Sequence, residues 1–205
     1  MLHAMSDSDD LKRRVSAWEV LSSDELYSHP YFRFRKDRCA LPNERIMPAY
    51  YVMEFVDWVN VVALTDDGKI VLVNQYRHAA KRRFYEFPGG TLEPENKNET
   101  PEIAAKRELQ EETGYVASRL TYLGLHYPNP GLQDNRMHVY LGTGCRKESE
   151  PQLDTYEDLE VELVDVQDFF QCIEQGRPMH SLMMASLTLA LPAIKKYYSV
   201  SSLAL

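Results

Sequence analysis

The stretch from Thr100 to Gly114 constrains the fold most, because both ends of a helix are marked in it. Thr100 is a residue type that caps the free N–H groups at the start of a helix, and Pro101 suits the first helical position. Glu102 suits the positive end of the helix dipole. Gly114 is the residue type that most often ends a helix in the left-handed conformation. The sequence therefore predicts a helix that begins after Thr100 and stops at Gly114.

Three glutamates lie on one face of this predicted helix. Glu108, Glu111 and Glu112 are spaced i, i+3 and i+4, which brings their carboxylates together. Like charges within one turn destabilise an isolated helix, and Arg107 is expected to point away from this face. Clustered carboxylate oxygens are the ligands that Mg²⁺ takes, with positions left for water and phosphates. A solvated, Glu-rich surface helix is the alternative interpretation.

The pattern of apolar residues predicts the elements around this helix. Strands are expected at Trp58–Leu64 and Ile70–Tyr76, joined by the turn Thr65-Asp66-Asp67-Gly68. Because strands and helices intermix without strict βαβ alternation, we predict an α/β fold with a mixed sheet and helices on both faces. The later elements expected are strands at Leu120–Tyr127, Met137–Gly142 and Leu159–Val166 and helices at Asp168–Gln175 and Ser181–Tyr198, the last kinked at Pro192.

The first quarter of the chain differs in composition. Residues 1–14 are polar and acidic, and we expect them to be disordered. Residues 15–56 are rich in Trp, Tyr and Phe but broken by prolines, so small strands and turns are predicted, with too little continuity for a core of their own. Residues 57–200 are expected to form the main domain. The interrupting prolines are Pro30, Pro42 and Pro48.

Composition excludes several classes of protein. With 205 residues, 44% of them hydrophobic, the chain can bury one sizeable core. A net charge of −8 disfavours general nucleic-acid binding, which rewards a basic surface. The beginning of the chain has no signal-peptide pattern, and the apolar run 182–194 is too short to span a bilayer. We therefore expect no nucleic-acid partner and no membrane association.

The cysteines indicate a reducing compartment. Cys39, Cys145 and Cys172 are odd in number, far apart and in no CxxC pair. This spacing argues against a disulfide framework and against a zinc cluster. The expected location is the cytoplasm.

The stretch from Gly90 to Tyr115 resembles the Nudix box. Arg107 to Tyr115 reads Arg-Glu-apolar-x-Glu-Glu-x-Gly-apolar, a pattern that arises by chance on the order of once in ten million positions. Glu99 lies eight residues before Arg107, and in the family the residues at these two positions commonly pair. One departure is that eight residues separate Gly90 from Glu99, where the family has five. We interpret the Leu92–Asn98 segment as a lengthened surface loop, which costs little to close.

The resemblance implies a metal site and catalytic residues. In the family, the glutamates matching Glu108 and Glu112 bind divalent metals with help from Glu111, and the backbone carbonyl at the position of Gly89 is a further ligand. The expected cofactor is Mg²⁺, with Mn²⁺ as a substitute, and such cations lower the pKa of an attacking water. The catalytic candidates are Glu111 and Glu157. Glu157 matches the general base that relatives carry on a mobile acidic loop, and a solvated acidic loop is the alternative.

Further marks are similar to the ADP-ribose pyrophosphatase branch of the family. They include the run Val71–Arg77, the segment Glu86–Gly90 and the position of Pro130, and the resemblance extends from about Trp18 to Tyr198. It implies that Arg77 contacts a substrate phosphate, although a surface arginine is the alternative. Pro130 and Asn135 are expected to contact substrate. Asn135 stands where many relatives carry glutamate, and an amide can both donate and accept hydrogen bonds, so several sugars fit.

The expected activity is hydrolysis of the diphosphate bond of ADP-ribose or a related nucleoside diphosphate sugar. The resemblance implies a Nudix-type α/β/α sandwich, preceded by the small N-terminal β-rich segment. GDP-mannose or another nucleotide is the nearest rival substrate, and a non-catalytic ligand-binding regulator with the same fold is the rival class. The resemblance also implies a homodimer, formed through residues 15–56, in which an aromatic side chain stacks on the base. The expected partners are a nucleotide sugar and a second copy of the chain.

Overall fold

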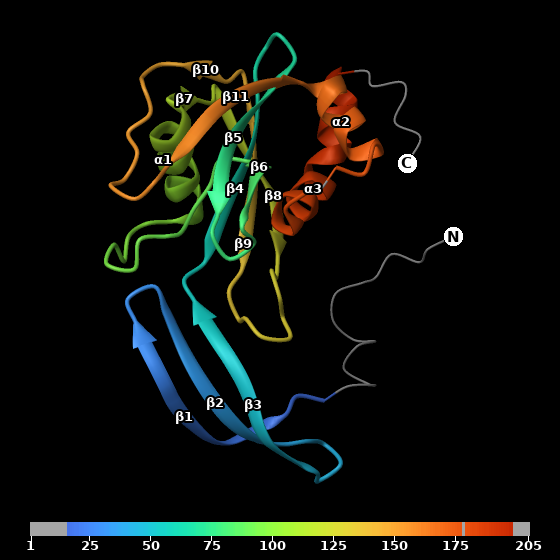
Figure 1. Ribbon diagram of the computed structural model, residues 1–205. Helices are drawn as coiled ribbons and strands as arrows, with labels where there is room; N and C mark the ends of the chain where they lie inside the picture. The colour runs from blue at the N-terminus through green and yellow to red at the C-terminus, as the bar shows by residue number, and fades with distance from the viewer. Residues whose placement is uncertain (1–15, 178, 199–205) are drawn as a thin grey trace. The chain divides into compact units, whose positions relative to one another are not determined.

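The computed structural model describes residues 16–177 and 179–198, so the N-terminus expected to be disordered lies outside the described residues. The chain divides into two compact units (Figure 1). One comprises the chain up to Phe55 together with Asn129–Asp134, and the other comprises Val56–Pro128 and the chain from Asn135 onward. Each unit contains its own sheet.

The N-terminal unit is built on a three-stranded antiparallel sheet. Its strands are β1 (Glu19–His29), β2 (Phe32–Ala40) and β3 (Ile46–Phe55), in the order β1-β2-β3. They run for 11, 9 and 10 residues. The prediction of small, discontinuous strands was therefore wrong, although the β-rich character was correct.

The prolines do not break these strands, because of where they fall. Pro30 lies in the turn between β1 and β2, and Pro42 lies in the loop after β2. Pro48 lies inside β3, at the point where the register with β2 passes from Asp37–Tyr50 to Cys39–Met47. Proline lacks the N–H that a ladder requires, and it is tolerated in an edge strand or at a bulge. Pro48 satisfies both conditions.

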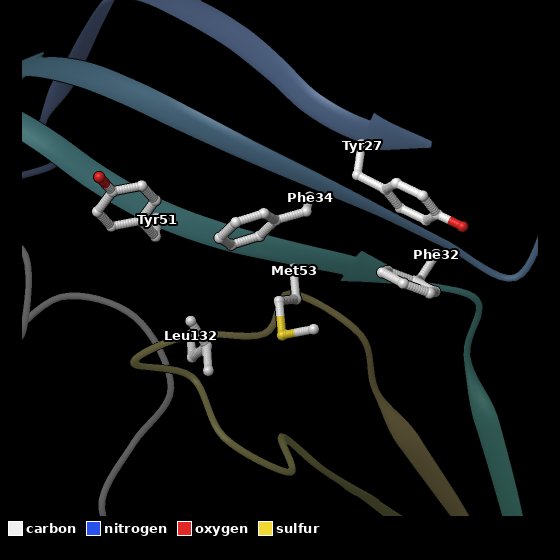
Figure 2. Close-up of a pocket in the computed structure, with 6 residues that line it drawn as sticks. All are labelled: Tyr27, Phe32, Phe34, Tyr51, Met53 and Leu132. Carbon is white, nitrogen blue, oxygen red and sulfur yellow. The ribbon is translucent and has the colours of Figure 1, made fainter. Parts of the chain in front are cut away.

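One face of this sheet carries an open apolar groove (Figure 2). All three strands contribute side chains to it. Where one strand contributes two of them, they are two residues apart, because such residues share a face of the sheet. Leu132, from the Asn129–Asp134 segment, completes the lining. This segment is attached to β3 through a hydrogen bond from the Met53 N–H to the Leu132 carbonyl at 2.8 Å. The strand residues of the groove are Tyr27, Phe32, Phe34, Tyr51 and Met53.

The second unit is built on a six-stranded mixed sheet. The strand order is β11-β5-β4-β9-β8. Strand β6 pairs with β5 over Val73–Arg77, beyond the residues of β5 that pair with β4. Strands β4 and β9 are parallel and the other neighbours are antiparallel, as the predicted mixed sheet requires. The strands are β4 (Trp58–Leu64), β5 (Lys69–Arg77), β6 (Arg82–Glu86), β8 (Arg119–His126), β9 (Met137–Thr143) and β11 (Leu159–Asp165), and a separate small pair consists of β7 (Tyr115–Val116) and β10 (Arg146–Lys147).

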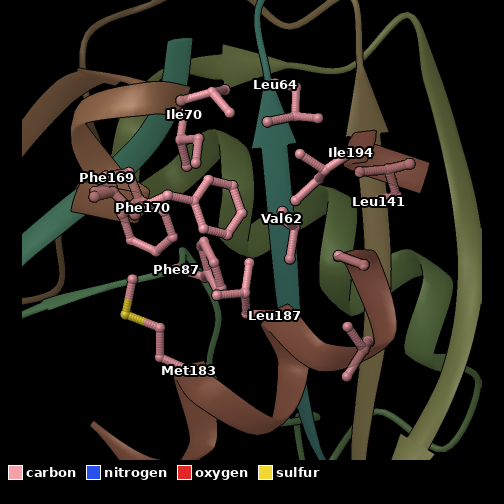
Figure 3. Close-up of a cluster of buried hydrophobic side chains, with 14 of the residues drawn as sticks. Val62, Leu64, Ile70, Phe87, Leu141, Phe169, Phe170, Met183, Leu187 and Ile194 are labelled. Atoms are coloured by element: carbon pink, nitrogen blue, oxygen red, sulfur yellow. The ribbon is translucent and has the colours of Figure 1, made fainter. Parts of the chain in front are cut away.

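Helices cover both faces of this sheet, which confirms the predicted α/β/α sandwich. Helix α1 (Pro101–Thr113) packs Ala104, Ala105 and Leu109 against one face. Helices α2 (Val166–Glu174) and α3 (Ser181–Tyr198) cover the other face, where their apolar side chains form the larger core (Figure 3). No helix in the described part of the chain is long and apolar enough to cross a membrane.

Helix α1 begins and ends where its sequence predicts. The hydroxyl of Thr100 accepts a hydrogen bond from the Ile103 N–H at 3.3 Å. Gly114 adopts the left-handed conformation with φ of 72° and donates its N–H to the Gln110 carbonyl. A Cβ at Gly114 would lie 2.0 Å from the Ser149 carbonyl oxygen, so only glycine fits there. The helix therefore has fixed ends, and the glutamates of its last two turns have fixed positions.

Candidate active site

The carboxylates of Glu108 and Glu112 are buried against the Gly89–Gly90 segment. Glu112 Oε2 accepts a hydrogen bond from the Gly89 N–H at 2.8 Å. A Cβ at Gly90 would lie 2.5 Å from Glu108 Oε1, so glycine is required for this carboxylate to approach the backbone. Glu108 is 8% exposed and Glu112 is 5% exposed. Burial of these two residues excludes the alternative interpretation, a solvated surface helix.

Strand β4 holds the glycine segment in place. The N–H of Val59 donates to the Gly90 carbonyl at 2.9 Å, and the N–H of Val61 donates to the Pro88 carbonyl at 2.8 Å. A Cβ at Gly89 would lie 2.1 Å from the Val59 carbonyl oxygen. The backbone at Gly89 is thus fixed between β4 on one side and Glu112 on the other.

Arg107 connects the loop before α1 to the glutamate face. Its Nε donates to Glu99 Oε1 at 2.9 Å, and its Nη2 donates to the Thr91 carbonyl at 3.0 Å. Its Nη1 donates to Glu108 Oε1 at 2.9 Å and to Glu111 Oε2 at 3.0 Å. The expectation that Arg107 points away from the glutamates was wrong. Residues four apart are neighbours on a helix, and the five donors of a guanidinium reach several acceptors at once.

The lengthened loop does not displace Glu99 from α1. The side chain of Glu99 is 1% exposed where it pairs with Arg107. It also accepts a hydrogen bond from the Glu93 N–H at 2.6 Å, which closes the loop on itself. Burial opposes the charge, but the hydrogen bonds from Arg107 and Glu93 leave the pKa of Glu99 below its ordinary value. The extra residues of the loop therefore lie between Glu93 and Glu99, whose contacts fix the two ends.

Burial determines the electrostatics of the two inner glutamates. Removal from water raises the pKa of Glu108 to about 7, against a smaller opposing effect of Arg107. Burial also raises the pKa of Glu112 well above its ordinary value, and the charges of Glu108 and Glu157 add to this increase. An opposite charge beside a carboxylate favours its ionised form, so a bound cation would offset the effect of burial on the pKa of both glutamates.

The candidate metal-ligand atoms of the site match a hard divalent cation. They are carboxylate and carbonyl oxygens, which Mg²⁺ prefers. Within the described residues no three His, Cys, Asp or Glu side chains already stand as a ligand set. Arg107 donates hydrogen bonds to oxygens of both Glu108 and Glu111. The carbonyls of Pro88 and Gly90 accept hydrogen bonds from β4. The Gly89 carbonyl lies between them in the sequence.

Arg77 and Glu157 lie within electrostatic reach of this cluster. The charges of Glu112 and Glu157 help to raise the pKa of Arg77, although Glu86 is the first cause. Glu157 raises the pKa of both Glu108 and Glu112. Arg77 therefore lies within electrostatic range of Glu112, and Glu157 lies within electrostatic range of Glu108 and Glu112.

The acidic loop that carries Glu157 is attached to the end of α1. The N–H of Gln152 donates to the Glu111 carbonyl at 2.7 Å, and the N–H of Ser149 donates to the Gly114 carbonyl at 3.2 Å. Glu157 Oε2 accepts a hydrogen bond from the Asp154 N–H at 3.0 Å, which forms a local turn. The loop thus has one end fixed beside the glutamate cluster.

Sequence reasoning missed Glu86. It is 6% exposed and binds Arg77 through two hydrogen bonds, Nε to Oε1 at 2.7 Å and Nη2 to Oε2 at 2.6 Å. It is the last residue of β6 (Arg82–Glu86), which pairs with β5. The signal that identifies it is a charged residue between Tyr85 and Phe87 in an otherwise apolar segment.

The two predicted sugar contacts lie in different units. Pro130 belongs to the Asn129–Asp134 segment of the N-terminal unit, whereas Asn135 belongs to the second unit. Asn135 is 2% exposed and its Nδ2 donates to the Val56 carbonyl at 3.4 Å. Its Oδ1 is buried, with no hydrogen-bond partner among the described residues.

Comparisons with known proteins agree with this geometry. The NUDIX domain family matches residues 55–185, and the family of nucleoside diphosphate sugar hydrolase N-terminal domains matches residues 18–53. The chain is 34% identical to an ADP-ribose pyrophosphatase of Bacillus subtilis over 76% of this chain and 83% of that protein. It is 37% identical to an ADP-ribose pyrophosphatase of Mycobacterium tuberculosis over 66% of this chain and 64% of that protein.

A solved structure shares the fold. It is described as "Crystal structure of ADP compounds hydrolase" and superposes with a TM-score of 0.76 at 20% sequence identity, covering 91% of this chain and 98% of that chain. Nudix hydrolases generally use divalent metals, which agrees with the oxygen donors described above. The family match covers most of the chain and includes the helix that carries the buried glutamates. The chain therefore belongs to the Nudix family and is a hydrolase that resembles the ADP-ribose pyrophosphatases.

Proposed function

We propose that the protein hydrolyses the diphosphate bond of ADP-ribose or a related nucleoside diphosphate sugar in the presence of Mg²⁺. The products are a nucleoside monophosphate and a sugar phosphate. The observation that carries this proposal is the burial of Glu108 and Glu112 against Gly89–Gly90, because buried carboxylates are commonly paired with a cation or bind a metal. The nearby guanidinium of Arg77 adds the positive charge that a diphosphate needs.

The proposed metal ligands are the side chains of Glu108, Glu111 and Glu112 and the carbonyl of Gly89. When bound there, Mg²⁺ neutralises the diphosphate and lowers the pKa of a water molecule. Arg107 has a positioning role, because it ties the helix to Glu99 and directs two of the glutamates. Its hold on Glu108 and Glu111 must loosen for these oxygens to bind metal.

Two glutamates are proposed to act on the reacting atoms. Glu157 removes the proton from the attacking water, and its charge already acts on Glu108 and Glu112. Glu111 contributes to the same step from α1, where its side chain is 43% exposed and accessible to water. Because Glu157 sits on a loop with one fixed end, closure of that loop over substrate brings its carboxylate to the water.

The proposed contacts to the sugar involve Pro130 and Asn135. Asn135 Oδ1 has no hydrogen-bond partner among the described residues, so this amide oxygen has unused capacity to accept a hydrogen bond. An amide at this position accepts and donates hydrogen bonds, so it suits more than one sugar.

We also propose that the protein acts as a homodimer through the β-rich N-terminal segment (residues 15–56), which precedes the Nudix domain of residues 57–200. The apolar groove on β1–β3 supports this, because apolar side chains gathered on one face of a sheet mark an interaction surface (Figure 2). In the dimer, an aromatic side chain of this face stacks on the nucleobase. The free thiols of Cys39, Cys145 and Cys172 suit the reducing cytoplasm as the place of action.

A substrate screen tests the proposed function. Nucleotide sugars, dinucleotides and nucleoside triphosphates are incubated with Mg²⁺, and phosphate release is measured after coupling to a phosphatase. We expect hydrolysis of ADP-ribose and of at least one other nucleoside diphosphate sugar within about tenfold in kcat/KM, a difference of roughly 1.4 kcal/mol. Triphosphates should be poor substrates because they offer no distal sugar. A preference for triphosphates over every sugar nucleotide contradicts the proposed substrate class.

A further inference from the structure

Glu86 is buried and forms an ion pair with the half-exposed Arg77, within electrostatic range of Glu112. They lie on neighbouring antiparallel strands, and the register pairs Glu86 with Val73 and Arg77 with Arg82. Val73 and Arg77 are an even number of residues apart, so both side chains project from the same face of β5. This is the face that α1 covers, because Val71 packs in the core with Leu109. The pair therefore lies on the side of the sheet that carries the active site.

Glu86 holds one edge of the Arg77 guanidinium, and the other edge lies outside this contact. Glu86 accepts from Nε at 2.7 Å and from Nη2 at 2.6 Å, which occupies the side edge of the planar group. An arginine has five donors in a rigid fork, and Nη1 lies outside the bidentate contact. The remaining edge is suited to an anionic phosphate oxygen.

The two partners differ in burial, and this decides which one is the support. The side chain of Glu86 is 8% exposed, whereas that of Arg77 is 45% exposed. The carboxylate is therefore held by the fold, and the guanidinium projects from it toward solvent. Glu86 is also three residues from Gly89, whose N–H binds Glu112. One short segment thus positions both the arginine and a proposed metal ligand.

We propose that Glu86 is a positioning residue that holds the side edge of Arg77 and directs its other edge at the diphosphate of the substrate. This deepens the proposed function, since it names the group that orients the phosphate-binding arginine. Glu86 itself does not touch substrate. Without it, Arg77 keeps its charge but loses a fixed direction, and the long side chain samples many rotamers.

A double-mutant cycle tests this role, with two probes. The variants are Glu86→Gln, Arg77→Met and the double variant, and Glu86→Asp is the conservative variant that keeps the charge. Asp165→Asn is the matched control, because it removes one charge from the Lys69–Asp165 ion pair on the same sheet. The first probe is ADP binding with Mg²⁺ by calorimetry, and the second is kcat and KM for the nucleotide sugar hydrolysed fastest.

We expect Glu86→Gln to weaken ADP binding and raise KM by about tenfold, which corresponds to 1.4 kcal/mol. In the Arg77→Met background the same change should have no further effect, because Glu86 acts through Arg77. Glu86→Asp should recover part of the loss, and Asp165→Asn should behave like the wild type. Melting temperatures with and without Mg²⁺ show whether each variant keeps its fold and metal site.

Additive effects in the double variant, or unchanged ADP binding in Glu86→Gln, overturn the positioning role. A wild-type protein that does not bind ADP overturns it as well, since no diphosphate then reaches Arg77. If ADP binding follows the expected pattern while no nucleotide sugar is hydrolysed, the proposed function fails and the role of Glu86 stands.

Discussion

The three-stranded and six-stranded sheets differ in how their faces are covered. The six-stranded sheet is covered on both faces, and Val61, Leu72 and Leu109 in its cores are at most 2% exposed. On the three-stranded sheet, Tyr27 is 53% exposed and Tyr51 is 45% exposed. The six-stranded sheet is therefore stabilised by apolar side chains that are buried within the chain itself. The three-stranded sheet leaves apolar side chains exposed, and their burial against another surface would stabilise it.

The largest expected effect concerns the chemistry on the covered sheet. Glu112→Gln removes a buried charge and keeps the size of the side chain, so activity should fall by roughly a thousandfold, or about 4 kcal/mol in transition-state stabilisation. Glu102→Gln is the control, since Glu102 lies on the same helix and pairs with exposed Lys106. Turnover and melting temperature are measured for both. Near wild-type turnover of Glu112→Gln at saturating Mg²⁺ would make the metal assignment wrong.

Truncation of one apolar side chain in each sheet compares the two sheets directly. Leu72→Ala removes a side chain that is 1% exposed, so the free energy of unfolding should fall by about 3 kcal/mol. Tyr27→Ala removes a half-exposed side chain and should cost less than about 1 kcal/mol when measured at a dilution that keeps the chain monomeric. Urea unfolding gives both values. Equal losses would mean that the apolar face of β1–β3 is covered within one chain.

Association is the third test of the comparison. Tyr27→Asp places a charge on the exposed groove, where it is solvated in the monomer but unpaired in an interface. We expect light scattering to find the wild type as a dimer at micromolar concentration and Tyr27→Asp with at least tenfold weaker association. Arg119→Asp, a charge change at the start of β8 on the other sheet, is the control. A monomeric wild type contradicts the proposed dimer.

The smallest expected effect is a shift in stability with pH. The folded-state pKa of Glu108 is raised to about 7 from 4.5, so the metal-free folded protein binds more protons than the unfolded chain between these values. Its stability should therefore fall as pH rises from about 4.5 to 7. Mg²⁺ replaces the proton, so it should raise Tm by several degrees at pH 8 and less at pH 5.5. A larger effect of Mg²⁺ at pH 5.5 would contradict this linkage.

Local patterns predicted the elements of the six-stranded sheet well. Strand β4 and helix α3 have the predicted bounds, and α1 begins and ends at its predicted caps. Such elements follow from the spacing of apolar residues and from capping residues, which act over a few positions. The long strands β1–β3 were underestimated, because whether Pro48 breaks a strand depends on its place at a sheet edge.

The sequence by itself determined that Glu108, Glu111 and Glu112 share one helix face, because residues three and four apart on a helix are neighbours. It also identified the Nudix family, whose box is a local pattern. Only the tertiary structure decided that two of these carboxylates are buried against Gly89–Gly90. Burial depends on what packs over an element, and this is not a property of the element's own residues. For the same reason the partnership of Arg77 with Glu86 appeared only when β6 paired with β5.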